Sequence, residues 1–275
     1  MNPGREPTRR AAPGPVAIIT GAARGIGAET AIRLAAAGWS LVLVDRCADD
    51  PVLSYPLARP EDLAATAAAC GGEEQAVTAV ADVRDQAALD AAVALGVERF
   101  GGLDAAVAVA GGIAGGNPAW ETGDDVWATM FGVNVEGAWR LARAAVPELL
   151  RRPEPRQGRV LAVSSAGGTL GLPLLTAYSA AKHAVVGFVR SLAAELGPAG
   201  ITVNAVAPGS TETAMLDASA EVYGLTGTAE FAGHHQLRRL VAPGEVAALL
   251  AWLCGPDSSG ITGAVLPVDA GMTAS

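Results

Sequence analysis

The sequence has 275 residues, 51% of them hydrophobic, which is enough for one large α/β domain or two small ones. Its net charge is −9, and because nucleic-acid binding needs a basic surface, neither DNA nor RNA is an expected partner. The longest uncharged apolar run, a dozen residues from Ala105, is broken by glycines and is too short to cross a membrane.

The first 14 residues, MNPGREPTRRAAPG, are rich in proline, glycine and arginine, and we expect them to form a disordered tail. The three cysteines, Cys47, Cys70 and Cys254, are odd in number and lie far apart in the sequence. They show no metal-ligand spacing, so we expect no bound metal and a location in the reducing cytoplasm.

From residue 15 onwards, short and almost wholly apolar runs alternate with longer amphipathic stretches. A strand without polar alternation is typical of a parallel sheet that helices cover on both faces. The predicted strands are residues 16–20, 40–44, 76–80, 105–109, 159–163, 201–207 and 264–268. The predicted helices are residues 25–37, 61–69, 85–100, 124–150, 177–196 and 244–254. This alternation predicts one α/β domain over residues 15–275, built on a doubly wound parallel sheet.

The first predicted strand leads into TGAARGIG, in which Gly21, Gly25 and Gly27 open a helix. Glycine permits a tight turn and lets backbone N–H groups reach a pyrophosphate at the helix N-terminus. The spacing alone would also fit a plain strand-to-helix turn. Its place between a strand and a helix favours a dinucleotide site.

Asp45 ends the second predicted strand, 18 residues after Gly27. A carboxylate at this place can accept hydrogen bonds from the ribose hydroxyls of NAD, and it repels the 2′-phosphate of NADP. Arg24 and Arg46 indicate the opposite preference, because either guanidinium could pair with that phosphate. We expect NAD, since Asp45 stands where the ribose must lie; a solvated acid at a strand end is the alternative.

The stretch AYSAAKHAVVGF places Tyr178 and Lys182 four residues apart, on one face of a helix. Free tyrosine has a pKa of about 10, so it needs a nearby cation to act as a base at neutral pH, and Lys182 can supply one. Ser165 lies 13 residues upstream, just after a strand, where ligands bind in such folds. Asn134 is a polar residue within an otherwise apolar helix, so it is either a packing amide or part of the site.

Taken together, these motifs resemble the short-chain dehydrogenase/reductase family. The resemblance runs from Val16 to Gly271 and includes NAVAPG at residues 204–209 and ITGAVLPVDAG at residues 261–271. It implies a single Rossmann-like domain, assembled as a homotetramer. It also implies an NAD-dependent enzyme that acts on the CH–OH group of a small-molecule alcohol, or on the corresponding ketone.

The resemblance further implies roles for individual residues. Ser165 would hydrogen-bond the substrate oxygen, and Tyr178 would be the acid/base. Lys182 would bind the nicotinamide ribose and lower the tyrosine pKa, while Asn134 would hold a water in a proton relay. The resemblance also implies a set of cofactor-binding residues, which includes the glycine turn and Asp45. They are Gly21, Arg24, Gly25, Ile26, Gly27, Asp45, Arg46, Cys47, Asp82, Val83, Ala110, Gly111, Tyr178, Lys182, Pro208, Gly209, Thr211 and Thr213.

One motif departs from the family pattern. After the fourth predicted strand the family has NNAG, whereas this chain has AVAG at residues 108–111. Ala110 and Gly111 keep the close backbone approach to the cofactor, but the two amides that usually brace the centre of the sheet are absent. The bracing must come from other residues, which the sequence does not identify.

The connection after Asp45 is unusually long, because 16 positions separate it from Glu61. The 46–60 insertion, together with GSTETAML (209–216) and HQLRRL (235–240), resembles the mycofactocin-coupled, carveol dehydrogenase-like subfamily. This resemblance implies that NAD is bound too tightly to exchange and that mycofactocin, a peptide-derived redox cofactor, removes the electrons. We expect the insertion to fold over the adenine half of NAD, since its three prolines make closure less costly. A surface decoration or an oligomer contact is the alternative.

Residues 210–240 are expected to form a substrate lid. Its apolar wall would consist of Met215, Leu216, Tyr223, Leu225 and Phe231, with Trp120, Leu170 and Leu172 from other loops. We expect His234 and His235 to be surface or lid residues, because the fold already has its acid/base.

Two other functions stay open. The chain could be an ordinary ketone or 3-oxoacyl reductase with exchangeable NAD(P)H, or a nucleotide-sensing regulator on an inactive scaffold. The intact set of Asn134, Ser165, Tyr178 and Lys182 argues against the regulator, because a sensor is free to lose those side chains.

Overall fold

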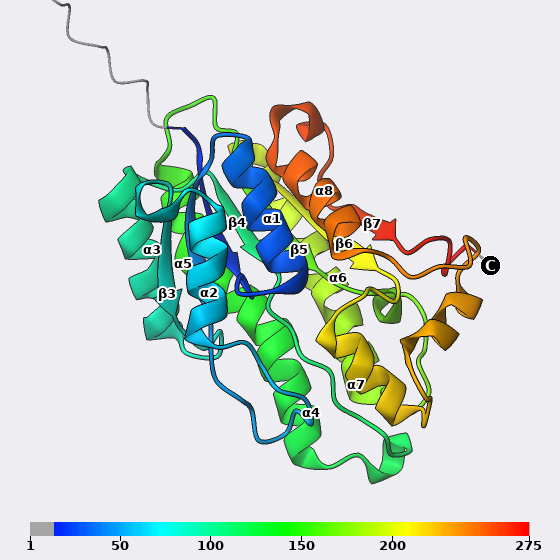
Figure 1. Cartoon of the computed structure of the whole chain (residues 1–275). Coiled ribbons are helices and arrows are strands. Elements are labelled where there is room, and N and C mark those ends of the chain that lie inside the picture. Colours follow the sequence, from blue (N-terminus) through cyan, green and yellow to red (C-terminus); the bar gives the residue numbers. More distant parts are fainter. Residues whose placement is uncertain (1–13, 275) are drawn as a thin grey trace, which may run out of the picture.

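Within residues 14–274, the part of the chain that this computed structural model describes, seven parallel strands form one sheet (Figure 1). Their order is β3-β2-β1-β4-β5-β6-β7. The strands are β1 Val16–Thr20, β2 Ser40–Asp45, β3 Ala76–Val80, β4 Ala105–Ala108, β5 Arg159–Val163, β6 Thr202–Pro208 and β7 Val265–Val268. The predicted strands are confirmed, with ends shifted by at most one residue. The expected disordered tail, residues 1–14, lies outside the described residues except for Gly14.

Successive side chains of each strand point to opposite faces of the sheet and enter two separate cores. In β1, Val16 and Ile18 belong to one core, and Ala17 and Ile19 belong to the other. All four are fully buried. Because both faces are covered, nearly every position of the strand is apolar, and Thr20 at its end is the exception.

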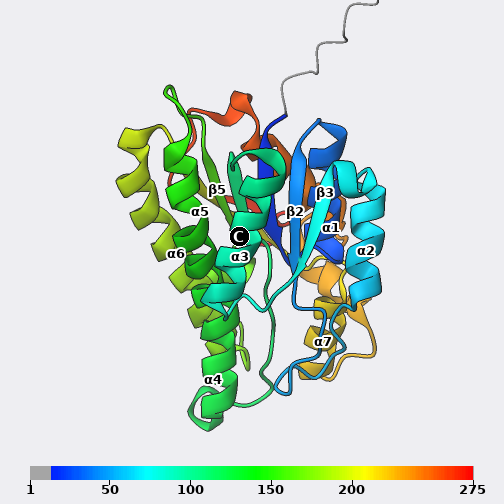
Figure 2. The same ribbon diagram turned by 90° about the vertical axis from the view of Figure 1, so that its left-hand side faces the viewer.

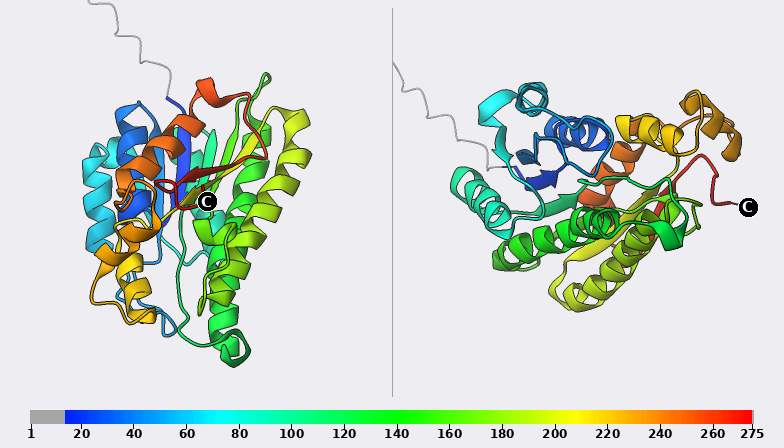
Figure 3. Two further views of the ribbon diagram at one scale, coloured as in Figure 1. Left: turned by 90° about the vertical axis from the view of Figure 1, so that its right-hand side faces the viewer. Right: turned by 90° about the horizontal axis from the view of Figure 1, so that it is seen from below.

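Helices cover both faces of the sheet, as Figures 2 and 3 show from three further directions. Side chains of α1, α2 and α8 enter one core, and those of α3, α5 and α6 enter the other. The helices are α1 Gly25–Ala36, α2 Pro60–Ala69, α3 Gln86–Phe100, α4 Asp124–Phe131, α5 Gly137–Arg151, α6 Thr176–Leu196, α7 Ala214–Val222 and α8 Pro243–Cys254. None of the helices in the described residues has the length and apolar character needed to span a bilayer.

Two helical features differ from the sequence-based expectation. The helix predicted over residues 124–150 is interrupted by a π-helical turn at Gly132–Glu136, which separates α4 from α5. Such turns occur often at functional sites, and this one contains the buried Asn134. In addition, the expected substrate lid contains α7, which no periodicity had indicated.

A third group of buried side chains lies outside the two main cores. It joins Leu53 and Tyr55 of the 46–60 insertion to Ile113, which follows β4, and to Tyr178 of α6. Figure 2 shows the insertion leaving the end of β2, passing beside α7 and returning to α2. The insertion therefore packs into the interior at the carboxyl end of the sheet.

Candidate active site

A cavity of about 500 Å³ lies at the carboxyl ends of the strands. It is lined by Gly21 after β1 and Ala110 after β4, so it opens where the strand order changes direction. Open α/β sheets bind their ligands at this point, and the volume is in the range of ordinary ligand sites. Of the predicted site residues, all line this cavity except Asn134 and Cys47.

The glycine turn leaves room only for backbone. Gly21 has a φ of +68°, and a Cβ there would lie 2.7 Å from the Ala110 nitrogen. A Cβ on Gly27 would lie 2.0 Å from the Gly21 carbonyl oxygen. The turn therefore presents the bare start of α1 to the cavity, and Thr213 lies opposite, 3.4 Å from a Cβ built on Gly25. This cradle fits the pyrophosphate of a dinucleotide.

Two threonines complete the far side of the cradle. The Thr211 hydroxyl donates to the Gly209 carbonyl (3.0 Å), and the Thr213 hydroxyl donates to the Thr211 carbonyl (3.2 Å). Gly209 has no room for a side chain either, since its Cβ would lie 2.9 Å from the Asp269 Cα. The end of β6 and the start of α7 are thereby placed beside the glycine turn.

Backbone amides orient the carboxylate of Asp45, the residue expected to bind the ribose. Asp45 accepts hydrogen bonds from the Ala23 N–H (3.1 Å) and the Cys47 N–H (3.3 Å), and it lines the cavity. The two arginines that could have favoured NADP already have partners. Arg24 donates to the Pro56 carbonyl at 2.9 Å, and Arg46 forms ion pairs with two aspartates. Of the two arginines, Arg46 is thus paired with acids, whereas Arg24 contacts only a neutral carbonyl.

Cys47, which the family resemblance includes among the cofactor-binding residues, is not among the residues that line the cavity. Its backbone adopts a left-handed conformation with φ of 54°, which turns the side chain into the core beside Ala58 and Leu63. Burial raises the pKa of its thiol to about 11, so the thiol stays neutral. Cys47 therefore serves packing.

Tyr178 and Lys182 lie on α6, and both line the cavity as buried side chains. The Lys182 Nζ donates to the Val163 carbonyl at 3.0 Å and lies 5.7 Å from the centroid of the Tyr178 ring. Burial raises the pKa of Tyr178 to about 12, while a hydrogen bond with Ser165 acts in the opposite direction. Burial also lowers the pKa of Lys182 to about 8. In this structure burial outweighs the expected lowering of the tyrosine pKa.

Ser165 is held beside the tyrosine by a short turn after β5. Its Oγ accepts a hydrogen bond from the Gly167 N–H at 3.0 Å. A Cβ on Gly167 would lie 3.3 Å from the Tyr178 ring and 3.5 Å from the Ser165 Oγ. The small residue thus lets the serine hydroxyl and the phenol face the same part of the cavity.

Asn134 lies behind the cavity wall, and its side-chain amide is occupied by backbone groups. Its Nδ2 donates to the carbonyls of Gly112 (3.0 Å) and Met130 (2.9 Å), and its Oδ1 accepts from the Gly112 N–H (3.3 Å). The sequence resemblance placed this residue in a proton relay. The structure shows its side chain bracing the segment that follows β4.

The same segment is braced from the 46–60 insertion. The Tyr55 hydroxyl accepts a hydrogen bond from the Ile113 N–H at 3.2 Å, and Leu53 packs against Gly112. Asn134 and Tyr55 therefore brace the residues that directly follow the AVAG stretch, where the two family asparagines are absent. Neither Leu53 nor Tyr55 stands out in the sequence as a site residue, although both line the cavity. The only signal was the presence of a tyrosine in a polar, proline-rich connection.

The substrate end of the cavity is apolar, in part as predicted. The predicted wall residues that line it are Leu172, Met215, Leu216, Tyr223 and Phe231. The predicted Leu170 and Leu225 are absent from this wall, and Trp120 is 84% exposed.

The two lid histidines differ in environment. His234 is exposed, whereas His235 is buried. The Nε2 of His235 accepts from the Ser210 N–H at 3.2 Å, and its Nδ1 is bonded to the Arg239 carbonyl. His235 therefore ties the two ends of the lid together.

Replacing Tyr55 with phenylalanine tests the bracing contact. The Ile113 N–H would lose its acceptor in a buried place, which is expected to lower the free energy of unfolding by about 1–3 kcal/mol. Tyr223→Phe is the matched control, because that hydroxyl donates to the Pro173 carbonyl in an exposed contact. Urea denaturation of both variants measures the difference. Equal stabilities for the two variants would contradict a bracing role for Tyr55.

Comparison with known proteins agrees with this geometry. Residues 21–273 match the family model described as enoyl-(acyl carrier protein) reductase. An uncharacterized NAD-dependent oxidoreductase of Mycobacterium tuberculosis is 39% identical over 273 residues, covering 94% of this chain and 95% of the relative. The (-)-trans-carveol dehydrogenase of Rhodococcus erythropolis is 36% identical over 275 residues, covering 94% of this chain and 98% of the relative.

A solved structure is similar over nearly the whole chain. The carveol dehydrogenase of Mycobacterium avium, crystallised in complex with NAD, has a TM-score of 0.90 and 38% sequence identity. The match covers 98% of this chain and 100% of that one. With a family model that matches residues 21–273 and relatives that match over nearly their whole length, the chain belongs to the short-chain dehydrogenase/reductase family.

Proposed function

We propose that this protein is an NAD-dependent oxidoreductase that transfers a hydride between a small alcohol or ketone and tightly bound NAD. The observation that carries the proposal is that one cavity is lined by the glycine turn, Asp45, Ser165, Tyr178 and Lys182. Relatives described as an NAD-dependent oxidoreductase and as carveol dehydrogenase support the same reaction class.

The chain's own residues then act on the substrate oxygen and its proton. NAD bound in the cavity would exchange a hydride with the carbinol carbon and, when oxidised, would add positive charge near Tyr178. Ser165 donates a hydrogen bond to the substrate oxygen. Tyr178 accepts the hydroxyl proton during oxidation and returns it during reduction. Lys182, with a pKa of about 8, is mostly charged at neutral pH and favours the phenolate in that step.

The preference for NAD over NADP rests on charge. Asp45 points a carboxylate at the position expected for the ribose, where it accepts hydrogen bonds from hydroxyls and repels a phosphate. Arg46, the nearest cation in the sequence, is already paired with Asp50 and Asp82. A 2′-phosphate would therefore meet the Asp45 carboxylate, while the Arg46 guanidinium beside it is already paired.

We further propose that the 46–60 insertion keeps NAD in place and that an external acceptor of the mycofactocin type removes the electrons. The support is that Asp50, Leu53 and Tyr55 of the insertion are buried and line the cofactor cavity. A covered cofactor leaves slowly, and a bound cofactor needs a second redox partner for turnover. The subfamily resemblance suggests mycofactocin as that partner.

The proposed substrate is an apolar alcohol, because the lid side of the cavity is lined by Met215, Leu216 and Phe231. As the family resemblance implies, we propose that the protein works as a homotetramer. We also propose a cytoplasmic location, with which its three free, buried cysteines are compatible.

Tyr178→Phe tests the acid/base assignment. Turnover of an alcohol with an artificial electron acceptor should fall by about 10²–10⁴-fold, the usual effect of one proton-transfer group. NAD content, read by absorbance and mass spectrometry, should stay unchanged. Ser179→Ala, one residue along, is the control and should keep its turnover. Near-normal turnover in Tyr178→Phe would reject the assignment.

Retention of NAD is tested by a chase with isotopically labelled NAD. The purified protein should keep its NAD through dialysis and exchange it slowly, because a covering segment lengthens residence more than it slows encounter. Replacing the 46–60 insertion with a short turn should release the cofactor. Exchange within seconds in the unaltered protein would favour the ordinary reductase with exchangeable NAD(P)H.

A further inference from the structure

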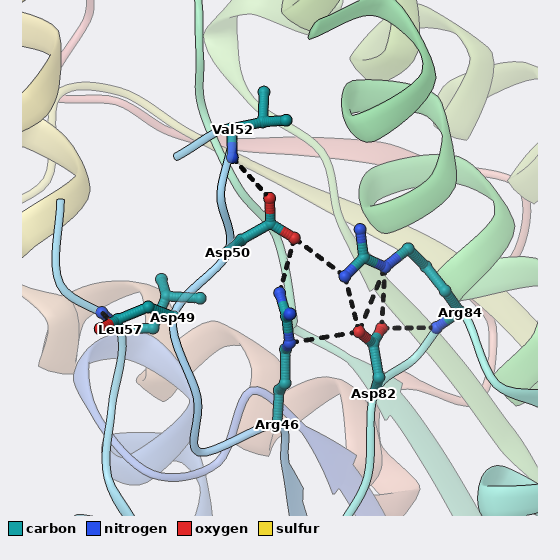
Figure 4. A network of polar contacts seen from close by, with 7 residues as sticks. All are labelled: Arg46, Asp49, Asp50, Val52, Leu57, Asp82 and Arg84. Atoms are coloured by element: carbon teal, nitrogen blue, oxygen red, sulfur yellow. Dashed lines mark hydrogen bonds and ion pairs between the residues drawn. The ribbon is translucent and has the colours of Figure 1, made fainter. Parts of the chain in front are cut away.

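Four charged side chains form one network beside the cofactor cavity (Figure 4). Arg46 and Arg84 both contact the same oxygen of Asp50, at 2.6 and 2.9 Å. The same two arginines contact Asp82, at 3.3 and 2.6 Å. All four residues line the cavity. Two acids and two bases leave the network without net charge.

Asp50 is the buried member of this network. Its side chain is 2% exposed, and its second carboxylate oxygen accepts from the Val52 N–H at 3.0 Å. Asp49, the preceding residue, is the opposite case, because its side chain is 52% exposed and pairs with Arg59 and Leu57 of the same connection. The insertion thus turns one acid inwards and its neighbour outwards.

The carboxylate of Asp50 is held in its charged form. Burial raises its pKa, but the Val52 amide and the two arginines outweigh burial, so the pKa lies below its usual value. Charge-assisted hydrogen bonds in a partly dry site are the stronger kind. Removing one partner of this buried contact should therefore cost more than removing one partner of an exposed pair, because it leaves an uncompensated charge in the interior.

The contacts of the insertion reach from the end of β3 to the segment that follows β4. Asp50 reaches Arg84, which follows β3, and Tyr55 reaches Ile113, which follows β4. In the sheet order β3-β2-β1-β4, strands β2 and β1 lie between these two anchors. Those two strands carry Asp45 and the glycine turn. Residues 50–55 therefore cross the place where the ribose and pyrophosphate are expected.

We propose that Asp50 clasps the insertion over bound NAD and, by the same contacts, occupies Arg46 and Arg84 so that they do not recognise a 2′-phosphate. Retention and cofactor choice thus depend on one side chain. The retention half of this inference rests on the proposed function. The selectivity half concerns equilibrium binding and does not depend on slow exchange.

The test compares Asp50→Asn with Asp49→Asn, which removes the same charge from the neighbouring, outward-facing residue. In a chase with labelled NAD, Asp50→Asn should release NAD about 10- to 100-fold faster than the unaltered protein, the range for losing hydrogen bonds to a charged group. Asp49→Asn should stay within about twofold. In binding titrations, the ratio of NADP to NAD affinity should rise about tenfold in Asp50→Asn, because two guanidinium groups lose a counter-charge.

Arg84→Gln breaks the clasp from outside the insertion, and it decides the outcome if Asp50→Asn does not fold. It should accelerate NAD release as well, and the double variant should release NAD more slowly than the product of the two single effects predicts, since both substitutions remove the same Asp50–Arg84 contact. Release from Asp50→Asn or Arg84→Gln as slow as from Asp49→Asn would overturn the clasp. If the unaltered protein itself exchanges NAD within seconds, the retention proposal fails, and the NADP titration alone decides whether Asp50 sets cofactor choice.

Discussion

A backbone N–H that is buried without an acceptor costs folding free energy, and the segment after β4 must meet this requirement without the asparagines of its family. It does so with two distant side chains. Asn134 holds Gly112 from the π-helical turn, and Tyr55 accepts from Ile113 across the cavity. Because one of these acceptors is on the 46–60 insertion, the insertion and the segment after β4 are joined by a buried hydrogen bond. The 46–60 insertion therefore helps to hold the residues that line the cavity.

Ion pairs between Asp50 and two arginines hold the earlier part of the same insertion. A pair of arginines beside a ribose-binding acid could have favoured NADP, but Asp50 and Asp82 neutralise Arg46 and Arg84 within the network. The proposed preference for NAD over NADP then follows from which charged side chains lack an ion-pair partner. The other end of the cavity has a wall of methionine, leucine and aromatic side chains, on which the proposal of an apolar alcohol rests.

The strands and most of the cavity lining could be predicted from sequence because both depend on local patterns. Apolar runs define the parallel strands, and the motifs follow strand ends that converge on one edge of the sheet. Three features carry little local signal, because two depend on contacts between distant residues and one on the backbone conformation of a single residue. The Tyr55–Ile113 bond joins residues 58 positions apart, Asn134 reaches back 22 positions, and Cys47 turns inwards through a positive φ. The spacing of apolar residues also does not reveal the π-helical turn that interrupts the helix predicted over residues 124–150.

The central claim is that the insertion stays closed for as long as NAD is bound, and amide hydrogen exchange tests it most directly. The Val52 and Ile113 amides donate to Asp50 and Tyr55, so each reports one anchor of the insertion. With NAD bound, both amides should exchange slowly, at rates no faster than the release of NAD measured on the same sample. Exchange of both amides within seconds, while NAD stays bound for hours, would contradict the account.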